Sequence, residues 1–146
     1  MIRRLDHIGV VANSWEEAQE VLLHQMGFTL NEVRTRMPEG NYFAPENARI
    51  YFIDVGSGET QLEILLPQDR VSGMGKFLAK RGPGLHHLGY AVDDVEAESR
   101  RLTEAGLQQI PIDGLKSASF FYPRSAMGIL TELVPVRTLT RVHSTA

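Results

Sequence analysis

Hydrophobic and polar residues alternate along this chain in patterns that predict a series of strands and helices. Residues 5–11 are rich in aliphatic and β-branched side chains, which is typical of a strand. Ser14, with Glu17 three residues later, has the spacing of a helix N-cap, and Gly27 is well placed to end that helix. The apolar face of the predicted helix consists of Trp15, Ala18, Val21, Leu22 and Met26.

The rest of the first half predicts three strands. Residues 28–36 have strand character, and residues 37–48, which contain two prolines and a glycine, predict a loop. Residues 50–55 and 60–66 flank a Gly-Ser-Gly turn at 56–58, a pattern typical of a β-hairpin. The first half therefore has the order strand, helix, strand, strand, strand.

The second half repeats this order after a helical linker. Residues 71–81 carry apolar side chains at helical spacing, and the Gly-Pro-Gly sequence at 82–84 interrupts the helix. A strand is predicted at 85–92, followed by a helix at 93–106 with Asp93 at its start. The closing strands are predicted at residues 117–122 and 129–134, and the polar residues after Pro135 are expected to form a frayed tail.

The two halves align at both ends. His7 lies in the sequence Asp-His-Ile-Gly-Val and His87 in the sequence His-His-Leu-Gly-Tyr, an offset of 80 residues (87 minus 7). Glu63, in Gln-Leu-Glu-Ile-Leu, corresponds to Glu132, in Leu-Thr-Glu-Leu-Val. Each half therefore contributes one histidine from its first strand and one glutamate from its last strand.

This repeat predicts the fold class and the domain organisation. We expect an α+β fold in which two βαβββ modules form curved, mostly antiparallel sheets around a central metal site. The modules are residues 5–67 and 84–135, joined by a helical linker at 71–83, within a single domain spanning residues 1–146. A chain of this length with 42% hydrophobic residues suits one globular core.

The paired histidines and glutamates suggest a metal site. Glutamate is rarely buried without a partner, so its place inside a strand calls for a compensating charge. If the modules face each other across a pseudo-twofold axis, His7, Glu63, His87 and Glu132 meet, and their ligand atoms suit one divalent cation. Four protein ligands leave positions open for substrate, as Lewis-acid catalysis requires. The absence of cysteine excludes thiolate ligands and cysteine nucleophiles.

Each residue of this set also has an ordinary structural interpretation. A lone histidine in a strand is usually structural and a lone glutamate usually faces solvent, but recurrence within the repeat favours the ligand interpretation. His86 competes with His87, yet only His87 is equivalent to His7, and adjacent strand residues point to opposite faces. Gln61 shares a face with Glu63 and is an alternative amide ligand. Two further histidines, His24 and His143, are interpreted as surface residues.

Charge and hydropathy narrow the location and the partners. The net charge of -3 and the pI near 5.9 provide no basic field that would attract nucleic acid or anionic lipid. No run of residues approaches the ~18 consecutive apolar positions of a transmembrane helix. We therefore expect a cytoplasmic protein that binds a small molecule, and neither a nucleic acid nor a membrane.

Seven short motifs carry a resemblance to a known family. They are GMGKFL at 73–78, GLHHL at 84–88, VDDVEA at 92–97, FYPRS at 121–125, GILTEL at 128–133, DHIGV at 6–10 and EILLP at 63–67. Together they resemble the vicinal oxygen chelate superfamily, which includes glyoxalases, bleomycin-resistance proteins and dioxygenases. Within it, they are most similar to the methylmalonyl-CoA epimerase family, and the resemblance extends from Leu5 to Val134.

The resemblance implies a metal-dependent epimerase. Such an enzyme catalyses a 1,1-proton shift on methylmalonyl-CoA through a metal-stabilised enolate, with a small-molecule acyl-CoA as its partner. The metal ligands implied are His7, Glu63, His87 and Glu132, and Glu132 is also the implied catalytic residue for proton transfer. The ion is expected to be cobalt, manganese, nickel or zinc, with iron(II) also compatible with these ligands, and the protein is expected to be a homodimer or a compact monomer.

Two regions depart from the family pattern. Some epimerases carry a glutamate in the third strand as a second base, whereas the matching position here is Arg49, with Glu46 in the preceding loop. Arg49 is either a partner of a substrate carboxylate or a solvated residue at the sheet edge. The family's glycine-rich stretch is replaced by residues 113–117, so Lys116 and Arg124 are either phosphate partners for coenzyme A or ordinary surface residues.

Other functions on the same scaffold remain alternatives. A lyase of the glyoxalase I kind would use the same four ligands on a glutathione hemithioacetal. A non-catalytic drug-binding protein like the bleomycin-resistance members characteristically lacks this ligand set. An extradiol dioxygenase needs only one carboxylate beside two histidines, whereas this chain offers two.

Overall fold

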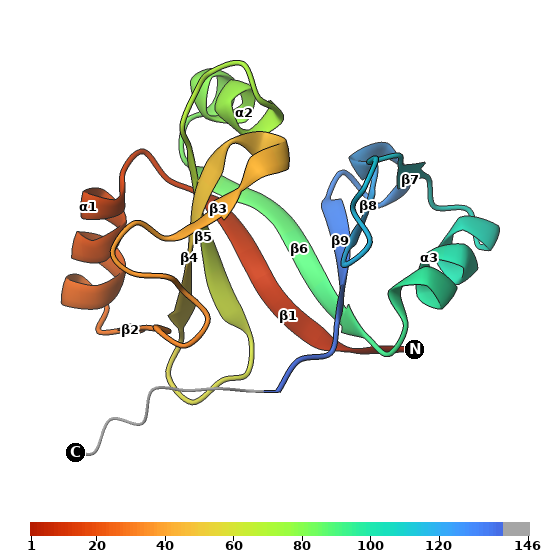
Figure 1. The fold of residues 1–146 in the computed structure, drawn as a ribbon, viewed down its shortest axis with the longest axis horizontal. Helices are drawn as coiled ribbons and strands as arrows, with labels where there is room; N and C mark the ends of the chain where they lie inside the picture. Colours follow the sequence, from red (N-terminus) through yellow and green to blue (C-terminus); the bar gives the residue numbers. More distant parts are fainter. Residues whose placement is uncertain (139–146) are drawn as a thin grey trace. The chain divides into compact units, whose positions relative to one another are not determined.

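The computed structural model describes residues 1–138 and has the mixed α+β composition that the sequence predicts (Figure 1). Contacts divide the chain into two compact units, residues 1–8 with 86–138 and residues 9–85. The module boundaries inferred from the repeat stay a prediction. Within the described part of the chain, no helix combines the length and the apolar character needed to span a membrane.

A β-hairpin forms the centre of the unit that contains residues 9–85. Strands β4 (Ala48–Asp54) and β5 (Gln61–Pro67) pair antiparallel, which confirms the predicted hairpin. Both strands are buried almost throughout, because each face of the pair is covered by apolar side chains. One face packs with Val11 and Met74, and the other packs with the first helical segment.

That helical segment begins where the sequence predicts but changes its geometry. Helix α1 (Trp15–Ala18) starts after Ser14, whose hydroxyl accepts a hydrogen bond from the backbone N–H of Glu17. It continues as the π-helix η1 (Gln19–Gln25), which ends with a bond from the Met26 N–H to the Val21 carbonyl, five residues back. The helical prediction is therefore confirmed in extent, but most of it is π-helical.

The prediction of a strand at residues 28–36 is largely wrong. Only β2 (Thr29–Leu30) is a strand, pairing with β4. The side chain of Asn31 accepts a hydrogen bond from the Arg34 N–H, and its carbonyl accepts one from the Thr35 N–H, so the chain turns at this point. Residues 37–48, predicted as a loop, contain the short strand β3 (Asn41–Phe43) and the 3-10 turn η2 (Ala44–Glu46).

The linker helix and the second helix both form. Helix α2 (Gly73–Arg81) begins after Ser72, which caps it, and ends at Gly82. Helix α3 (Val95–Glu104) is capped by Asp94 and not by Asp93, because the Asp94 carboxylate accepts the Ala97 N–H. The Asp93 carboxylate instead pairs with Arg3 at the surface.

The other unit contains the beginning of β1 (Ile2–Val11) and a row of strands β6 (Gly84–Val92), β9 (Leu130–Pro135), β8 (Ser119–Phe121) and β7 (Gln109–Ile110). Strand β7 pairs with β8 and is the third strand that the repeated βαβββ order requires after the helix, although no residues were assigned to it from the sequence. Strand β9 lies antiparallel to β8 but parallel to β6, in a register that sets Glu132 opposite Gly89.

The segment after β9 is ordered as far as the described residues extend. The Val136 N–H bonds to the Val92 carbonyl, and the Arg137 side chain bonds to Asp6. The expectation of a frayed tail directly after Pro135 is therefore wrong for Val136 and Arg137. Residues 139–146, including His143, lie outside the described part of the chain.

Candidate metal centre

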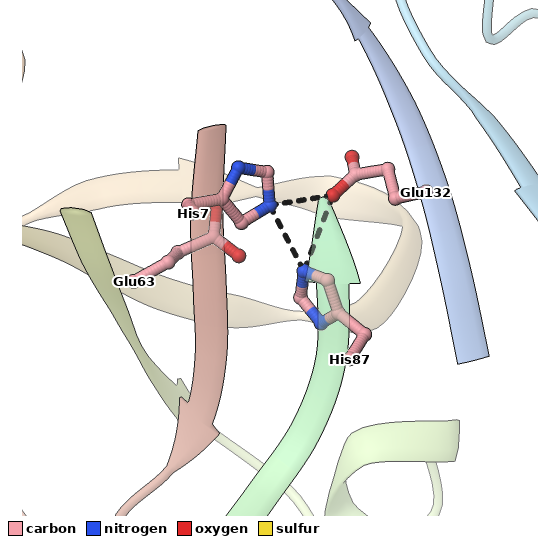
Figure 2. A group of neighbouring side chains, drawn as sticks. All are labelled: His7, Glu63, His87 and Glu132. Carbon is pink, nitrogen blue, oxygen red and sulfur yellow. Dashed lines mark hydrogen bonds and ion pairs between the residues drawn. The ribbon is translucent and has the colours of Figure 1, made fainter. Parts of the chain in front are cut away.

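Three of the four predicted ligands meet within the unit formed by residues 1–8 and 86–138. His7 comes from β1, His87 from β6 and Glu132 from β9 (Figure 2). The Oε1 atom of Glu132 lies 2.7 Å from Nε2 of His7 and 3.1 Å from Nε2 of His87, and the two Nε2 atoms are 3.1 Å apart. Residues 80 and 125 positions apart in sequence are thereby brought into direct contact.

The site is almost closed to solvent. His7, His87 and Glu132 are 1%, 4% and 8% exposed, respectively. Burial by itself raises the pKa of Glu132, but its hydrogen bonds with His7 and His87 outweigh burial and lower the pKa to about 2. The carboxylate is therefore ionised at neutral pH, which is the form that binds a metal ion.

The chemistry of this group suits a divalent cation. Two imidazole nitrogens and one carboxylate oxygen point to a common centre, and each has a lone pair to offer when deprotonated. A metal ion would replace the protons that these atoms otherwise share. The Nδ1 atom of His7 lies 2.8 Å from Oδ2 of Asp6, and a carboxylate only accepts, so Nε2 is the nitrogen that His7 presents to the centre.

The fourth predicted ligand, Glu63, belongs to the unit of residues 9–85; Figure 2 labels it with the other three. It lies in β5 directly opposite Phe52 of β4 and is 9% exposed. The alternative, Gln61, uses both ends of its amide within the same unit. Its Nε2 donates to Asp54 at 2.7 Å and its Oε1 accepts from Arg34 at 2.6 Å.

His86 supports His87 and does not join the group. The Nδ1 atoms of the two rings are 2.9 Å apart, and the rings meet edge to face. Burial, and then the neighbouring His87, lower the pKa of His86 to about 4, so this ring is neutral at neutral pH. The sequence comparison that preferred His87 to His86 therefore agrees with the geometry. His24, as predicted, lies at the surface, where it pairs with Glu20.

Arg49 and Glu46, which depart from the epimerase pattern, do not lie on the face of the β4–β5 hairpin that carries Glu63. Arg49 is on the opposite face of β4 from Phe52, and its guanidinium lies 4.8 Å from the ring centre of Tyr42. Glu46 accepts a hydrogen bond from the Met74 N–H at 3.0 Å, at the first turn of α2. Arg49 is half-buried on that face and stacks on Tyr42, whereas Glu46 joins its loop to α2; a role for Arg49 toward a substrate carboxylate stays a prediction.

A different arginine occupies the face of β4 and β5 that carries Glu63. The guanidinium of Arg34 lies 3.7 Å from the ring centre of Phe52, the residue opposite Glu63, and bonds to Gln61. The sequence provided no signal for this residue, because it was assigned to a strand that does not form. Its position depends on the turn at Asn31.

Gly89 was also missed as a site residue, although the repeat contained its signal. A Cβ atom on Gly89 would lie 2.1 Å from Cε1 and 2.4 Å from Nε2 of His7. The glycine therefore makes room for the imidazole on the neighbouring strand. Both halves of the sequence carry a glycine two residues after the histidine, a pattern that a search for tight packing would have flagged.

The two predicted phosphate partners have separate surroundings. Lys116 lines a cavity of about 690 Å³ beside α3, together with Arg100 and Ser99. Arg124 is 4.5 Å from the ring centre of Tyr122 and donates to Gln108. Lys116 and Arg124 thus have different neighbours, and a role for either residue in binding coenzyme A stays a prediction.

Comparison with known proteins shows similarity over most of the chain. The model of the family described as Glyoxalase/Bleomycin resistance protein/Dioxygenase superfamily matches residues 6–119. An ethylmalonyl-CoA/methylmalonyl-CoA epimerase of Cereibacter sphaeroides is 29% identical over 143 residues, covering 93% of this chain and 100% of that protein. The uncharacterized protein YqjC of Bacillus subtilis is 28% identical over 137 residues, covering 90% of this chain and 91% of its own.

A solved structure agrees with these relatives. The crystal structure of methylmalonyl-CoA epimerase from Mycobacterium tuberculosis superimposes with a TM-score of 0.78 and 29% sequence identity. The match covers 93% of this chain and 90% of that one. The similarity therefore concerns the whole fold and not one motif.

Proposed function

Because the chain belongs to the glyoxalase/bleomycin resistance protein/dioxygenase superfamily, as its motifs predicted, we propose that it is a metal-dependent epimerase acting on methylmalonyl-CoA. Two similar proteins and one solved structure bear the name methylmalonyl-CoA epimerase, alone or with ethylmalonyl-CoA. Their sequences are 25% to 29% identical to this chain. The reaction would move a proton off and back onto the carbon between the thioester and the carboxylate of the substrate.

The observation that carries this proposal is the meeting of His7, His87 and Glu132 in a nearly closed site. We propose Glu63 as the fourth ligand. It occupies in the first half the position that Glu132 occupies in the second, and it is a buried carboxylate on β5. A bound divalent ion, whether cobalt, manganese, nickel or zinc, supplies a fixed positive charge that stabilises the negative charge developing on the thioester.

Glu132 is the residue that we assign to proton transfer. Its carboxylate is ionised at neutral pH, as a proton acceptor must be, and it is held in place by two imidazoles. Because Glu132 is only 8% exposed, charge interactions around it are screened less than at the surface.

The decisive experiment is solvent isotope exchange. Protein purified without chelator is analysed for metal and then incubated with methylmalonyl-CoA in deuterium oxide. We expect deuterium at C2 of the substrate, loss of exchange after metal removal and recovery when cobalt is restored. Glu132→Gln should reduce the rate by ~10²–10⁴-fold, the usual contribution of general acid–base catalysis. A second variant, His7→Ala, removes a proposed metal ligand. Its matched control is His24→Ala, which removes an exposed imidazole.

Two results would contradict the proposal. One is metal-loaded protein that leaves the C2 hydrogen in place while consuming methylglyoxal with glutathione, which would favour the glyoxalase alternative. The other is protein that contains no metal and binds a drug tightly. Adding metal to this protein would then produce no deuterium exchange. The same preparations can be analysed by light scattering, where we expect a homodimer.

A further inference from the structure

A chain of hydrogen bonds connects Nδ1 of His7, the ring nitrogen that does not face the metal centre, to Asp6 and Arg137. Oδ2 of Asp6 lies 2.8 Å from Nδ1 of His7, and Oδ1 of the same carboxylate accepts a bond from Nε of Arg137 at 2.9 Å. The Arg137 carbonyl in turn accepts a bond from Arg4 at 3.1 Å. These residues belong to one unit, and Asp6 is 0% exposed.

We propose that Asp6 and Arg137 are positioning residues that fix the ring of His7 for metal binding. This inference rests on the proposed function, since it assumes that His7 is a ligand. Histidine ligands commonly donate their second N–H to a carboxylate, which selects the tautomer, limits rotation of the ring and makes the ligating nitrogen more basic. Asp6 is in the position to do all three.

The geometry explains why both oxygens of Asp6 matter. A carboxylate held only by His7 could rotate about its own side-chain bonds and would leave a buried charge with one partner. Arg137 occupies the other oxygen, so the carboxylate plane is held from two sides. Arg137 follows β9, the strand that carries Glu132, and its side chain is 18% exposed. The segment directly after β9 therefore contributes to the centre through Asp6.

This arrangement differs from an ordinary surface ion pair. Arg3 also pairs with an aspartate, Asp93, through Nε at 2.8 Å, but both side chains are about half exposed, at 52% and 46%. Among the described residues, Asp93 has no hydrogen bond to a proposed metal-binding side chain. Arg3→Ala is consequently a matched control for Arg137→Ala, because it removes the same side chain and the same kind of bond from the same unit.

The test is the affinity for cobalt(II), measured by chelator competition on protein whose fold is verified by circular dichroism. We expect Asp6→Asn to weaken binding by about 10–100-fold and Arg137→Ala by on the order of 10-fold, with partial recovery in Arg137→Lys. Arg3→Ala should stay within about twofold of the wild type, since exposed pairs contribute little. The visible absorption of bound cobalt should also change in Asp6→Asn, whereas a purely structural role would alter only thermal stability.

The possible outcomes separate this inference from the proposed function. Wild-type protein that binds no cobalt and exchanges no deuterium refutes the function itself. Wild-type protein that binds and exchanges, with Asp6→Asn and Arg137→Ala equal to it in affinity and in cobalt spectrum, refutes only the positioning role. Asp6→Asn keeps the size and the acceptor oxygen of the original side chain, so the test stands even if Arg137→Ala fails to fold.

Discussion

Gly89 provides a direct test of how tightly the candidate centre is packed. An added Cβ at this position in β6 would lie 2.1, 2.4 and 2.6 Å from three atoms of the His7 ring. Carbon atoms in contact are normally ~3.5–4.0 Å apart, so the ring would have to move by more than about 1 Å. His7 is 1% exposed, and its ring is already in contact with Asp6, His87 and Glu132.

The expected cost of Gly89→Ala follows from this overlap. Overpacking a well-packed interior destabilises a protein by ~1–3 kcal/mol. Gly89 is not among the glycines with positive φ, so its backbone tolerates alanine, and a strand with alanine is by itself ~0.5–1 kcal/mol more stable than one with glycine. A ligand displaced by ~1 Å should also reduce catalysis by ~10²-fold.

The assay is a double-mutant cycle measured by urea unfolding of metal-free protein. Gly89→Ala should lower the free energy of unfolding by ~1–3 kcal/mol in the wild type, but should be neutral or stabilising in His7→Ala, where the ring is gone. The difference between the two backgrounds isolates the contact between Gly89 and His7. An equal loss of stability in both backgrounds would refute this explanation of the glycine.

Three further predictions concern other parts of the molecule. Glu46→Ala should lower the free energy of unfolding by ~1 kcal/mol, because the first turn of α2 loses the acceptor of the Met74 N–H. The variant should keep its deuterium exchange. Loss of exchange in a stable variant would make Glu46 a proton-transfer residue. The side chain of Asn47, and then the Ser72 N–H, lower the pKa of Asp69 to about 2, so Asp69 stabilises the fold above its ordinary pKa of 3.8 and loses this effect as the pH falls to about 2. The melting temperature of Asp69→Asn should therefore fall less steeply than that of the wild type over this range, and parallel curves would contradict the assignment. Adding the metal at ~100 times its dissociation constant should stabilise the protein by ~2.7 kcal/mol, and a melting temperature that does not respond to the metal or to a chelator would argue against the site.

The elements predicted correctly are those whose signals are local. The hairpin of β4 and β5, helix α2 and helix α3 each follow from side-chain spacing and from the turn or cap residues at their ends. Residues 28–36 were mistaken for a strand because their composition suits one, whereas the hydrogen bonds of Asn31 favour a turn. The short strands β3 and β7 depend on neighbours that their own sequences do not specify.

The candidate centre divides in the same way. The internal repeat was sufficient to select His7, His87 and Glu132 as partners and to prefer His87 to His86, because equivalent positions in two related modules carry related roles. The repeat could not reveal that Arg49 and Phe52 lie on opposite faces of β4, that Glu46 accepts the Met74 N–H of α2, or that Arg34 occupies the face of Glu63. Those positions depend on where the chain turns and on which face of a strand each side chain lies. An error in one segment, such as residues 28–36, therefore changes the predicted position of every side chain in it.

By itself, the sequence determined the order of the elements and the residue types available to bind a cation, since periodicity and composition are properties of neighbouring positions. Only the tertiary structure decided that an imidazole on β1 fits against Gly89 on β6, and that Arg137, just after β9, holds the Asp6 carboxylate. The physical reason is that strand register fixes distances between residues 80 to more than 100 positions apart, and the free energy that selects one register comes from packing across the whole sheet.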